Sequence, residues 1–158
     1  MVGKGDKAPD FEAIVHTGEK VRLSDLRGKI VVLYFYPRAM TTGCTREGIR
    51  FNELIDEFEK LGAVVLGAST DPVEANRKFA EKYGFRFKLI SDPEGKIAEA
   101  YGVLQKRGDK ISAKRTTFII DKDGTIVEVL RNVRPAEKHA DMALEIVRKL
   151  SSEAEAKS

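Results

Sequence analysis

The segment Ile30–Tyr36, with the sequence IVVLYFY, is an unbroken run of β-branched, aliphatic and aromatic residues. Such a run is typical of a strand buried on both faces, because a strand with one face in water alternates apolar and polar residues. Pro37 follows directly and predicts the end of the strand, since proline cannot donate a hydrogen bond to a neighbouring strand. We therefore expect a central strand in a sheet that is covered by helices.

The residues after this strand predict alternating helices and strands. Apolar residues with helical spacing extend over Thr45–Leu61, and Gly62 is a suitable terminator. A second buried strand is expected at Ala63–Ala68, followed by a helix that starts after Asp71-Pro72 and ends at Gly84. This βαβ alternation implies right-handed crossovers and parallel pairing of the strands.

Shorter elements complete the prediction on both sides of this core. They are strands at Phe11–Val15, Val21–Leu23 and Lys88–Ile90, a turn or helical loop at Ser24–Lys29, a short helix at Lys96–Tyr101, a β-hairpin of Lys114–Asp121 and Thr125–Arg131 around Lys122-Asp123-Gly124, and a last amphipathic helix from Pro135 to Leu150. The hairpin adds antiparallel strands to the parallel ones. The order of elements predicts an α/β three-layer sandwich with a mixed central sheet, and its βαβ–ββα core is the thioredoxin arrangement.

Length and composition are typical of one globular domain, which we expect over residues 1–150 of the 158. The tail Ser151–Ser158 lacks large apolar residues and is expected to fray. The net charge of +3 comes from 28 basic and 25 acidic residues that are interleaved along the chain, which argues against a nucleic-acid binder. No run approaches the length of a membrane span and the N-terminus lacks the apolar segment of a signal peptide, so no membrane partner is expected.

The chain has a single cysteine, Cys44, which excludes an intramolecular disulfide. One cysteine also argues against a cysteine-based zinc site and against a secreted, disulfide-stapled protein. We therefore expect a cytoplasmic protein with no metal and no other cofactor. One Gln and three Asn stand beside 34% charged residues, a composition that occurs in proteins of thermophiles.

Cys44 lies where the central strand is followed by a helix, at the edge of the sheet where α/β folds place ligands. Free backbone N–H groups and the helix dipole stabilise a negative charge there, which favours the thiolate, the form that attacks electrophiles. A lone cysteine can instead be a small buried hydrophobe. Because Cys44 follows a polar, turn-prone stretch instead of an apolar periodic one, we predict a reactive nucleophile.

The segment Tyr34–Glu47 has the sequence YFYPRAMTTGCTRE, with Pro37, Thr41 and Cys44 in fixed spacing. It resembles the active-site loop of the peroxiredoxins, whose motif is proline, three residues, threonine or serine, two residues and cysteine. FYP before the motif and Cys-Thr-x-Glu at its end are similar to the peroxiredoxin Q branch, also called bacterioferritin comigratory protein. The resemblance spans nearly the whole chain, since it includes GDKAPDF at residues 5–11, LSD at 23–25, GK at 28–29 and RTTFIID at 115–121.

This resemblance implies a thiol-dependent peroxidase of the thioredoxin fold that acts on hydrogen peroxide and organic hydroperoxides. Cys44 would be the peroxidatic cysteine, with the Thr41 hydroxyl beside its sulfur and the incoming peroxide. Arg115 is expected to project from its strand toward the thiolate, where its permanent charge stabilises the negative charge of the sulfur and of the transition state.

Three further residues take supporting roles by the same resemblance. Pro37 is expected to shield the site from bulk water, and the backbone N–H groups of Gly43 and Cys44 complete the site for the peroxide oxygens. Glu47, one helical turn after Cys44, is expected to orient Arg115.

For some of these residues the sequence also allows an ordinary structural role. Thr41 could be only an N-cap, Arg115 a surface residue of its strand, and Glu47 a helix-surface glutamate. His16 in a turn and His139 on the last helix are expected to be solvated surface residues.

The chain departs from the family pattern at two positions. Many peroxiredoxin Q proteins have a resolving cysteine five residues after the first, where this chain has Ile49, native or engineered. The sulfenic acid on Cys44 then has no internal partner, so a small thiol or a thioredoxin-like protein is the expected reductant. Thr42 stands where the family often has proline, a change that could loosen the loop. The resemblance further implies a monomer or a weak homodimer.

Two other functions are compatible with a reactive thiol. One is a redox sensor in which Cys44 forms mixed disulfides without turnover. The other is a thioredoxin-like disulfide reductase, which the absence of a Cys-x-x-Cys pair disfavours, because that chemistry uses a second thiol to release the partner. The rate at which peroxide oxidises Cys44 distinguishes the enzyme from the sensor.

Overall fold

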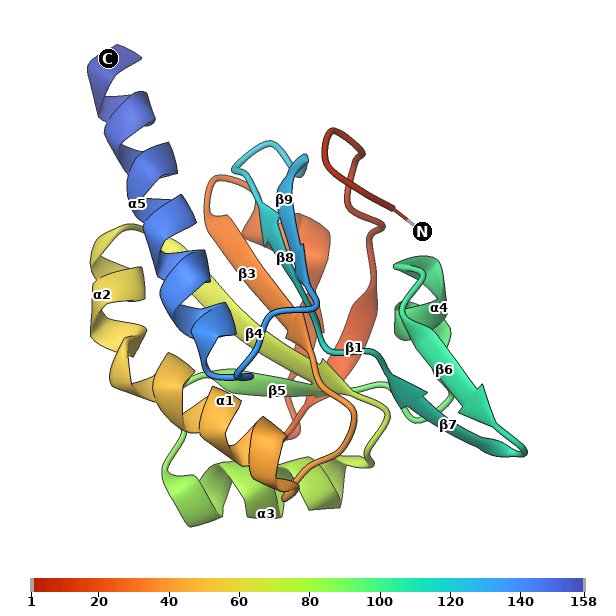
Figure 1. Ribbon diagram of the computed structural model, residues 1–158. Helices are drawn as coiled ribbons and strands as arrows, with labels where there is room; N and C mark the ends of the chain where they lie inside the picture. The colour runs from red at the N-terminus through yellow and green to blue at the C-terminus, as the bar shows by residue number, and fades with distance from the viewer. Residues whose placement is uncertain (1, 158) are drawn as a thin grey trace.

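A seven-stranded mixed sheet forms the centre of the structure, a computed structural model that describes residues 2–157 (Figure 1). Its strands are β1 (Glu12–Val15), β2 (Lys20–Arg22), β3 (Ile30–Phe35), β4 (Ala63–Ser69), β5 (Lys88–Ser91), β8 (Thr116–Ile120) and β9 (Ile126–Arg131). The strand order is β2-β1-β5-β4-β3-β8-β9. The β3–β4 and β4–β5 pairs are parallel, whereas β3–β8 and β8–β9 are antiparallel, so the predicted mixed sheet is confirmed.

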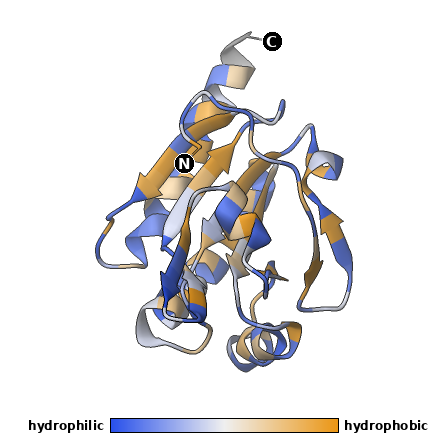
Figure 2. Ribbon diagram, turned by 90° about the vertical axis from the view of Figure 1, so that its right-hand side faces the viewer, coloured by the Kyte–Doolittle hydropathy of each residue, from blue (hydrophilic) through white to orange (hydrophobic). Residues whose placement is uncertain are grey.

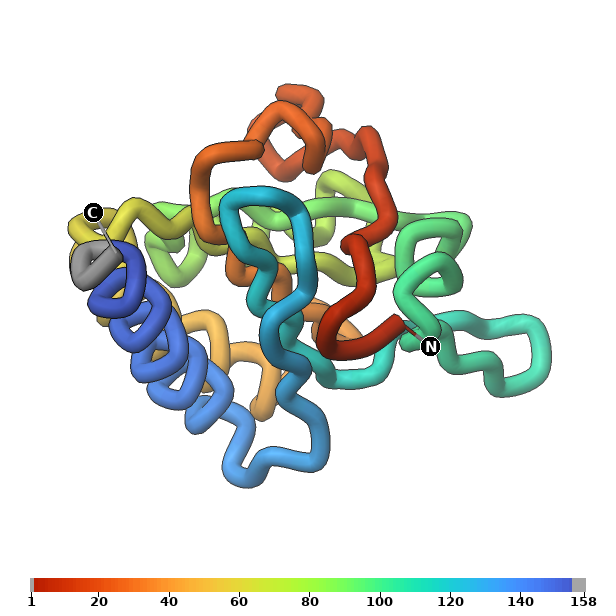
Figure 3. Tube along the Cα trace, turned by 90° about the horizontal axis from the view of Figure 1, so that it is seen from above, coloured from red at the N-terminus to blue at the C-terminus, as the bar shows by residue number. Residues whose placement is uncertain are grey.

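The helices cover both faces of this sheet. They are α1 (Thr42–Glu53), α2 (Ile55–Lys60), α3 (Val73–Tyr83), α4 (Lys96–Ala100) and α5 (Lys138–Lys157), with a 3₁₀ turn, η1, at Leu23–Leu26. In Figures 1 and 3, α5 and α4 lie on opposite sides of the molecule. Among residues 2–157, no helix combines the length and the apolar character needed to cross a membrane.

The central strand β3 contributes side chains to two separate cores. Val32 and Tyr34 pack with α1, α2, α3 and α5, whereas Val31 and Leu33 pack with α4 and η1. All six residues of β3 are buried, as an apolar run without polar alternation predicts. Figure 2 shows the same contrast: the strands at the centre are mostly hydrophobic, whereas the helices carry both kinds of residue.

The helix expected over residues 45–61 starts earlier and is broken in two. Its first residue is Thr42, and Leu54 lies between α1 and α2 with φ −96° and ψ 3°. The N–H of Leu54 donates to the carbonyls of both Arg50 and Phe51, which tightens the chain at the break. Residues 49–61 contain neither glycine nor proline, so no residue signals this break in the sequence.

The structure contains a second, two-stranded sheet that was not predicted from the sequence. Strands β6 (Leu104–Arg107) and β7 (Lys110–Ala113) form an antiparallel hairpin whose turn contains Gly108 with φ 64°. Its charged residues are largely exposed, so the apolar alternation that marks a strand is weak. Gly108 followed by Asp109 was the available turn signal.

The last helix is longer than expected. Helix α5 extends through Lys157, beyond the expected end at Leu150, and Ser158 lies outside the described residues. The fraying expected for the tail stays a prediction. Residues 151–157 contain two Ala and two Glu and no glycine or proline, so their composition is compatible with a continuing helix.

Helix α1 packs so closely on the aromatic core that a residue larger than glycine at position 48 is expected to destabilise the fold. A methyl group at this position would overlap the ring of Phe85, which packs against Phe79 and Phe87 at centroid distances of 5.1 Å each. In Gly48→Ala, overpacking of roughly 1–3 kcal/mol should outweigh the helix-propensity gain of ~1 kcal/mol. We expect a lower free energy of unfolding in urea, with Arg46→Ala on the exposed side of α1 as the control. A Gly48→Ala protein as stable as the parent would contradict this packing.

Candidate active site

Cys44 lies in the first turn of α1 and is buried, with 1% of its surface exposed. The first hydrogen bond within the helix runs from the N–H of Thr45 to the carbonyl of Thr41, at 2.9 Å. The N–H groups of Thr42, Gly43 and Cys44 come before this bond and have no carbonyl four residues back in the helix. The sulfur therefore lies at the positive end of α1, where a thiolate is stabilised.

Arg115 is brought to Cys44 by the pairing of two central strands. Phe35, the last residue of β3, pairs with Thr116, the first residue of β8, so the chain segments that continue from these strands lie together. The Nη2 of Arg115 donates to the Sγ of Cys44 at 3.4 Å. A side chain at Gly43 would have its Cβ only 3.0 Å from the same Nη2, so the glycine leaves room for the guanidinium.

Glu47 holds the other side of the same guanidinium. Its Oε1 accepts from the Nη1 of Arg115 at 2.6 Å, and its side chain is 0% exposed. The alternative of a helix-surface glutamate is therefore wrong. Burial raises the pKa of Glu47 to about 8, although the charge of Arg115 and its hydrogen bond act in the opposite direction. The arrangement fixes the orientation of Arg115, because its two amino groups contact different partners.

His139 is also part of this buried cluster, which corrects the prediction of a solvated surface residue. It is 0% exposed, and its Nδ1 lies 2.9 Å from the hydroxyl of Thr117 and 3.9 Å from Oε2 of Glu47. Burial, reinforced by the charge of Arg115, lowers the pKa of His139 to about 4, so the ring is neutral near pH 7. His16 is not fully solvated either, since its Nδ1 accepts a hydrogen bond from the N–H of Leu89 at 3.1 Å.

The burial of His139 could have been predicted from its spacing to the apolar residues of the last helix. His139, Ala143 and Val147 are spaced by four residues, and all three are fully buried. A histidine in register with an apolar helix face indicates burial. Thr117, its partner on β8, has no comparable signal, because every residue of that strand is buried.

The remaining predicted residues lie in the loop before α1. Pro37 follows β3 and is partly buried, and Thr41 occupies the N-cap position of α1. The Thr41 side chain is exposed, and its hydroxyl donates to the carbonyl of Arg38 at 2.8 Å; within the described residues it has no hydrogen bond to Cys44. Asp71 holds this loop by accepting the N–H of Ala39 at 2.8 Å.

The neutral state of His139 predicts a pH dependence of stability. Its pKa is about 4 in the folded protein, below the ordinary histidine value of 6.5, so the unfolded chain binds the proton more readily between these values. This contribution to stability is present above pH 6.5 and is lost as the pH falls toward 4, by roughly 3 kcal/mol. Glu47, with its raised pKa, acts oppositely and favours the folded state at low pH.

Urea unfolding of the parent and of His139→Asn between pH 7 and pH 4 isolates the histidine contribution. Asparagine keeps a polar group near Thr117 and does not titrate, so the stability difference between the two proteins should shrink as the pH falls. Parallel curves would contradict a neutral buried imidazole.

Comparisons with known proteins agree with this architecture. A model of the AhpC/TSA family matches residues 4–129. Peroxiredoxin Bcp of Bacillus subtilis is 42% identical over 151 residues, which cover 93% of this chain and 96% of the relative. The chloroplastic peroxiredoxin Q of Sedum lineare is 37% identical over 149 residues, covering 94% of this chain and 80% of the relative.

Solved structures show the same similarity in three dimensions. The crystal structure of peroxidoxin BcpB from Mycobacterium tuberculosis matches with a TM-score of 0.90 and 42% identity, covering 94% of this chain and 98% of that one. Peroxiredoxin Q of Xanthomonas campestris matches with a TM-score of 0.83 and 33% identity, covering 89% and 91%. The chain therefore belongs to the AhpC/TSA family and, within it, to the peroxiredoxins of the Bcp and Q type.

Proposed function

We propose that this chain is a thiol-dependent peroxidase that reduces hydrogen peroxide and organic hydroperoxides with Cys44 as its nucleophile. The observation that carries the proposal is the contact between the Arg115 guanidinium and the Cys44 sulfur at the start of α1. Family membership supports it, and one matching structure concerns the alkyl peroxide reduction activity of the Xanthomonas campestris bacterioferritin comigratory protein.

The oxidative step follows from these positions. The Cys44 thiolate attacks the terminal oxygen of the hydroperoxide, so that the S–O bond forms as the O–O bond breaks. The products are a sulfenic acid on Cys44 and an alkoxide or hydroxide. This anion takes up, through solvent, the proton that the Cys44 thiol released on ionising, and it leaves as an alcohol or water. Arg115 and the free N–H groups of Gly43 and Cys44 stabilise the charge on the oxygens as it develops.

Pro37 and Thr41 act at the entrance of the site in this proposal. Pro37 limits the access of bulk water. The Thr41 hydroxyl exchanges the carbonyl of Arg38, which it contacts in the structure, for the peroxide oxygen when the substrate enters. Glu47 keeps the guanidinium of Arg115 in place during the reaction.

The reductive step requires a second molecule, because the chain has no other cysteine and Ile49 occupies the position of the family's resolving residue. An external thiol attacks the sulfenic sulfur, releases water and leaves a mixed disulfide, and a second thiol then releases Cys44. We propose a small thiol or a thioredoxin-like protein as the donor. A cytoplasmic monomer or weak homodimer fits this cycle, since a reducing compartment supplies thiols.

Peroxide consumption measured in parallel with dithiothreitol, a small monothiol and a thioredoxin system tests this function. Stopped-flow oxidation of Cys44 should be many orders of magnitude faster than that of a free thiol. Mass spectrometry of the intact chain after peroxide treatment should show an added oxygen on Cys44. Slow oxidation without turnover would point instead to the redox-sensor function.

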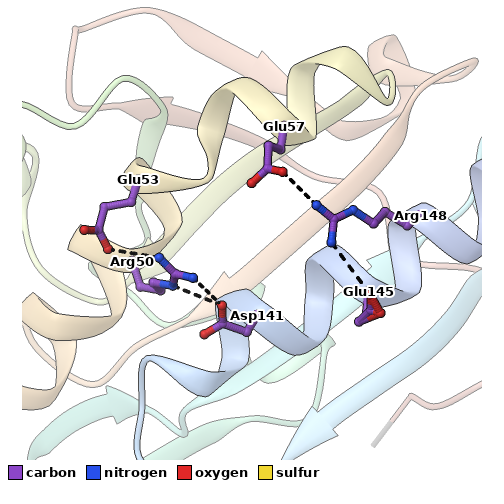
Figure 4. A network of polar contacts seen from close by, with 6 residues as sticks. All are labelled: Arg50, Glu53, Glu57, Asp141, Glu145 and Arg148. Atoms are coloured by element: carbon purple, nitrogen blue, oxygen red, sulfur yellow. Dashed lines mark hydrogen bonds and ion pairs between the residues drawn. The ribbon is translucent and has the colours of Figure 1, made fainter.

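Ion pairs between helices support a further proposal, that the protein comes from a thermophile. Arg50 of α1 pairs with Asp141 of α5 at 2.7 Å, and Arg148 of α5 pairs with Glu57 of α2 at 2.7 Å. Figure 4 shows that each arginine also contacts a second carboxylate, so the pairs form small networks. Such exposed pairs are worth only ~0–1 kcal/mol at room temperature, but networks gain weight on heating.

We expect thermal unfolding with a midpoint above the ~45–65 °C of mesophile domains. Circular dichroism during heating measures it, and Asp141→Asn should lower the midpoint. A parent protein that unfolds within the mesophile range would remove this proposal.

A further inference from the structure

A hollow of about 330 Å³ lies beside the active site, between the β7–β8 connection and the segment that joins β9 to α5. Its walls include three basic residues, Lys114, Arg115 and Arg134, and the amides of Gln105 and Asn132. No carboxylate is among the residues that line it. The hollow, which we call the basic hollow, therefore presents a positive, hydrogen-bonding surface.

His139 adds a second, independent sign of a missing ligand. His139 is among the residues that line the basic hollow, and its Nδ1 lies 2.9 Å from the Thr117 hydroxyl and 3.9 Å from Oε2 of Glu47. The other ring nitrogen, Nε2, is buried and has no hydrogen-bond partner within the described residues. When the Thr117 hydroxyl donates to Nδ1, the proton of the neutral ring is on Nε2, which is then a buried donor without a partner in a residue that lines the hollow. A buried polar atom without a partner is costly, so an acceptor from a ligand would stabilise it.

Arg115 contacts both the basic hollow and the nucleophile. Arg115 is among the residues that line the hollow, and its Nη2 donates to the Cys44 sulfur at 3.4 Å. A molecule bound in the hollow would therefore lie beside a residue that contacts the nucleophile. Arg115 is already held by Glu47 on its buried side, so Lys114 and Arg134, both exposed, supply the further positive charge of the hollow.

We propose that the basic hollow binds the carboxylate of a co-substrate of the peroxidase. A carboxylate accepts two hydrogen bonds in one plane and suits the planar fork of arginine, with Lys114 as a further charge. This inference rests on the proposed function, because either the hydroperoxide or the reducing thiol could carry the carboxylate. Both react at Cys44, and Arg115, which contacts the Cys44 sulfur, is among the residues that line the hollow.

Matched pairs of co-substrates distinguish the two sources. In the oxidative arm, stopped-flow rates of Cys44 oxidation are compared for cumene hydroperoxide and its para-carboxylate. In the reductive arm, steady-state rates at saturating hydrogen peroxide are compared for 2-mercaptoethanol and 3-mercaptopropionate. Each rate ratio, charged over neutral, is measured for the parent, for Arg134→Gln, for Lys114→Gln and for the control Lys106→Gln, which is exposed on β6 and does not line the hollow.

In at least one arm we expect the ratio to fall about fivefold in Arg134→Gln and in Lys114→Gln, and to stay at the parental value in Lys106→Gln. Raising the salt concentration should reduce the parental ratio as well, because exposed charges are screened. The intrinsic reactivity of each compound cancels, since every compound is compared across variants. The arm in which the ratio falls identifies the carboxylate as that of the hydroperoxide or of the thiol.

Two negative results have different meanings. Ratios that are the same in all four proteins, in both arms, would overturn the carboxylate subsite while leaving the peroxidase intact. A parent protein that reduces peroxide with none of these compounds would overturn the proposed function itself.

Discussion

Cys44→Ser is expected to abolish peroxide reduction, with a fall in turnover of roughly 10⁴- to 10⁶-fold. A serine hydroxyl has nearly the same shape as the thiol but remains protonated, so neither the helix N-terminus nor Arg115 can present it as an anion. The measurement is peroxide consumption with dithiothreitol, together with stopped-flow oxidation of the protein.

The control is the fold itself. Because Cys44 is 1% exposed and serine is similar in size, the variant should keep the circular dichroism spectrum of the parent. Thr45→Ser, a comparable change one residue later in α1, should retain activity. Peroxide reduction by Cys44→Ser at a rate near that of the parent would disprove the role of this residue.

Arg115→Gln is expected to lower the second-order rate constant for oxidation of Cys44 by about 10²- to 10³-fold, the usual effect of removing a group that stabilises charge in a transition state. The variant loses the contact to the sulfur at 3.4 Å and leaves the buried Glu47 without its ion-pair partner. Arg115→Lys keeps a charge but cannot contact Sγ and Oε1 from two amino groups, so an intermediate rate is expected.

Stopped-flow measurements over a range of peroxide concentrations give these rate constants. Arg107→Gln, at the exposed end of β6, is the matched control and should behave like the parent. A rate constant for Arg115→Gln within about threefold of the parental value would show that the contact at the sulfur has no catalytic weight.

The sequence was most informative where a single local pattern determines the structure. The apolar run at Ile30–Phe35 predicts a strand buried on both faces, and Asp123-Gly124 predicts the turn of the β8–β9 hairpin, where Gly124 has φ 89°. The position of Cys44 after the central strand predicted a reactive thiol, and the resemblance of Pro37, Thr41 and Cys44 to the peroxiredoxin motif implied the active-site loop. These features depend on neighbouring residues, so they can be read without knowing the tertiary contacts.

Features that depend on distant contacts were harder to predict. The contacts of Arg115 with Cys44 and Glu47 were expected only through the family resemblance, and the burial of the cluster was not expected. The burial of Glu47 arises because β8 and α5 close over α1, bringing Thr117 and His139 from far along the chain. Because the residues next to Glu47 in its helical turn are mostly polar, the local sequence does not indicate that this side chain is buried. The β6–β7 hairpin was missed for a different reason, because an exposed hairpin does not need the apolar alternation by which strands are recognised.

The pairing of Phe35 with Thr116 has a consequence for how heat inactivates the protein. The register of β3 and β8, two strands with neighbours on both sides, brings together the chain segments that carry Cys44 and Arg115. Amides in such strands exchange with solvent only when the whole fold opens, and a slip by one residue would turn every side chain to the opposite face. This strand pairing should persist until the whole fold opens. Warming should therefore end catalysis at the temperature of global unfolding, and Cys44 and Arg115 should not separate at a lower temperature.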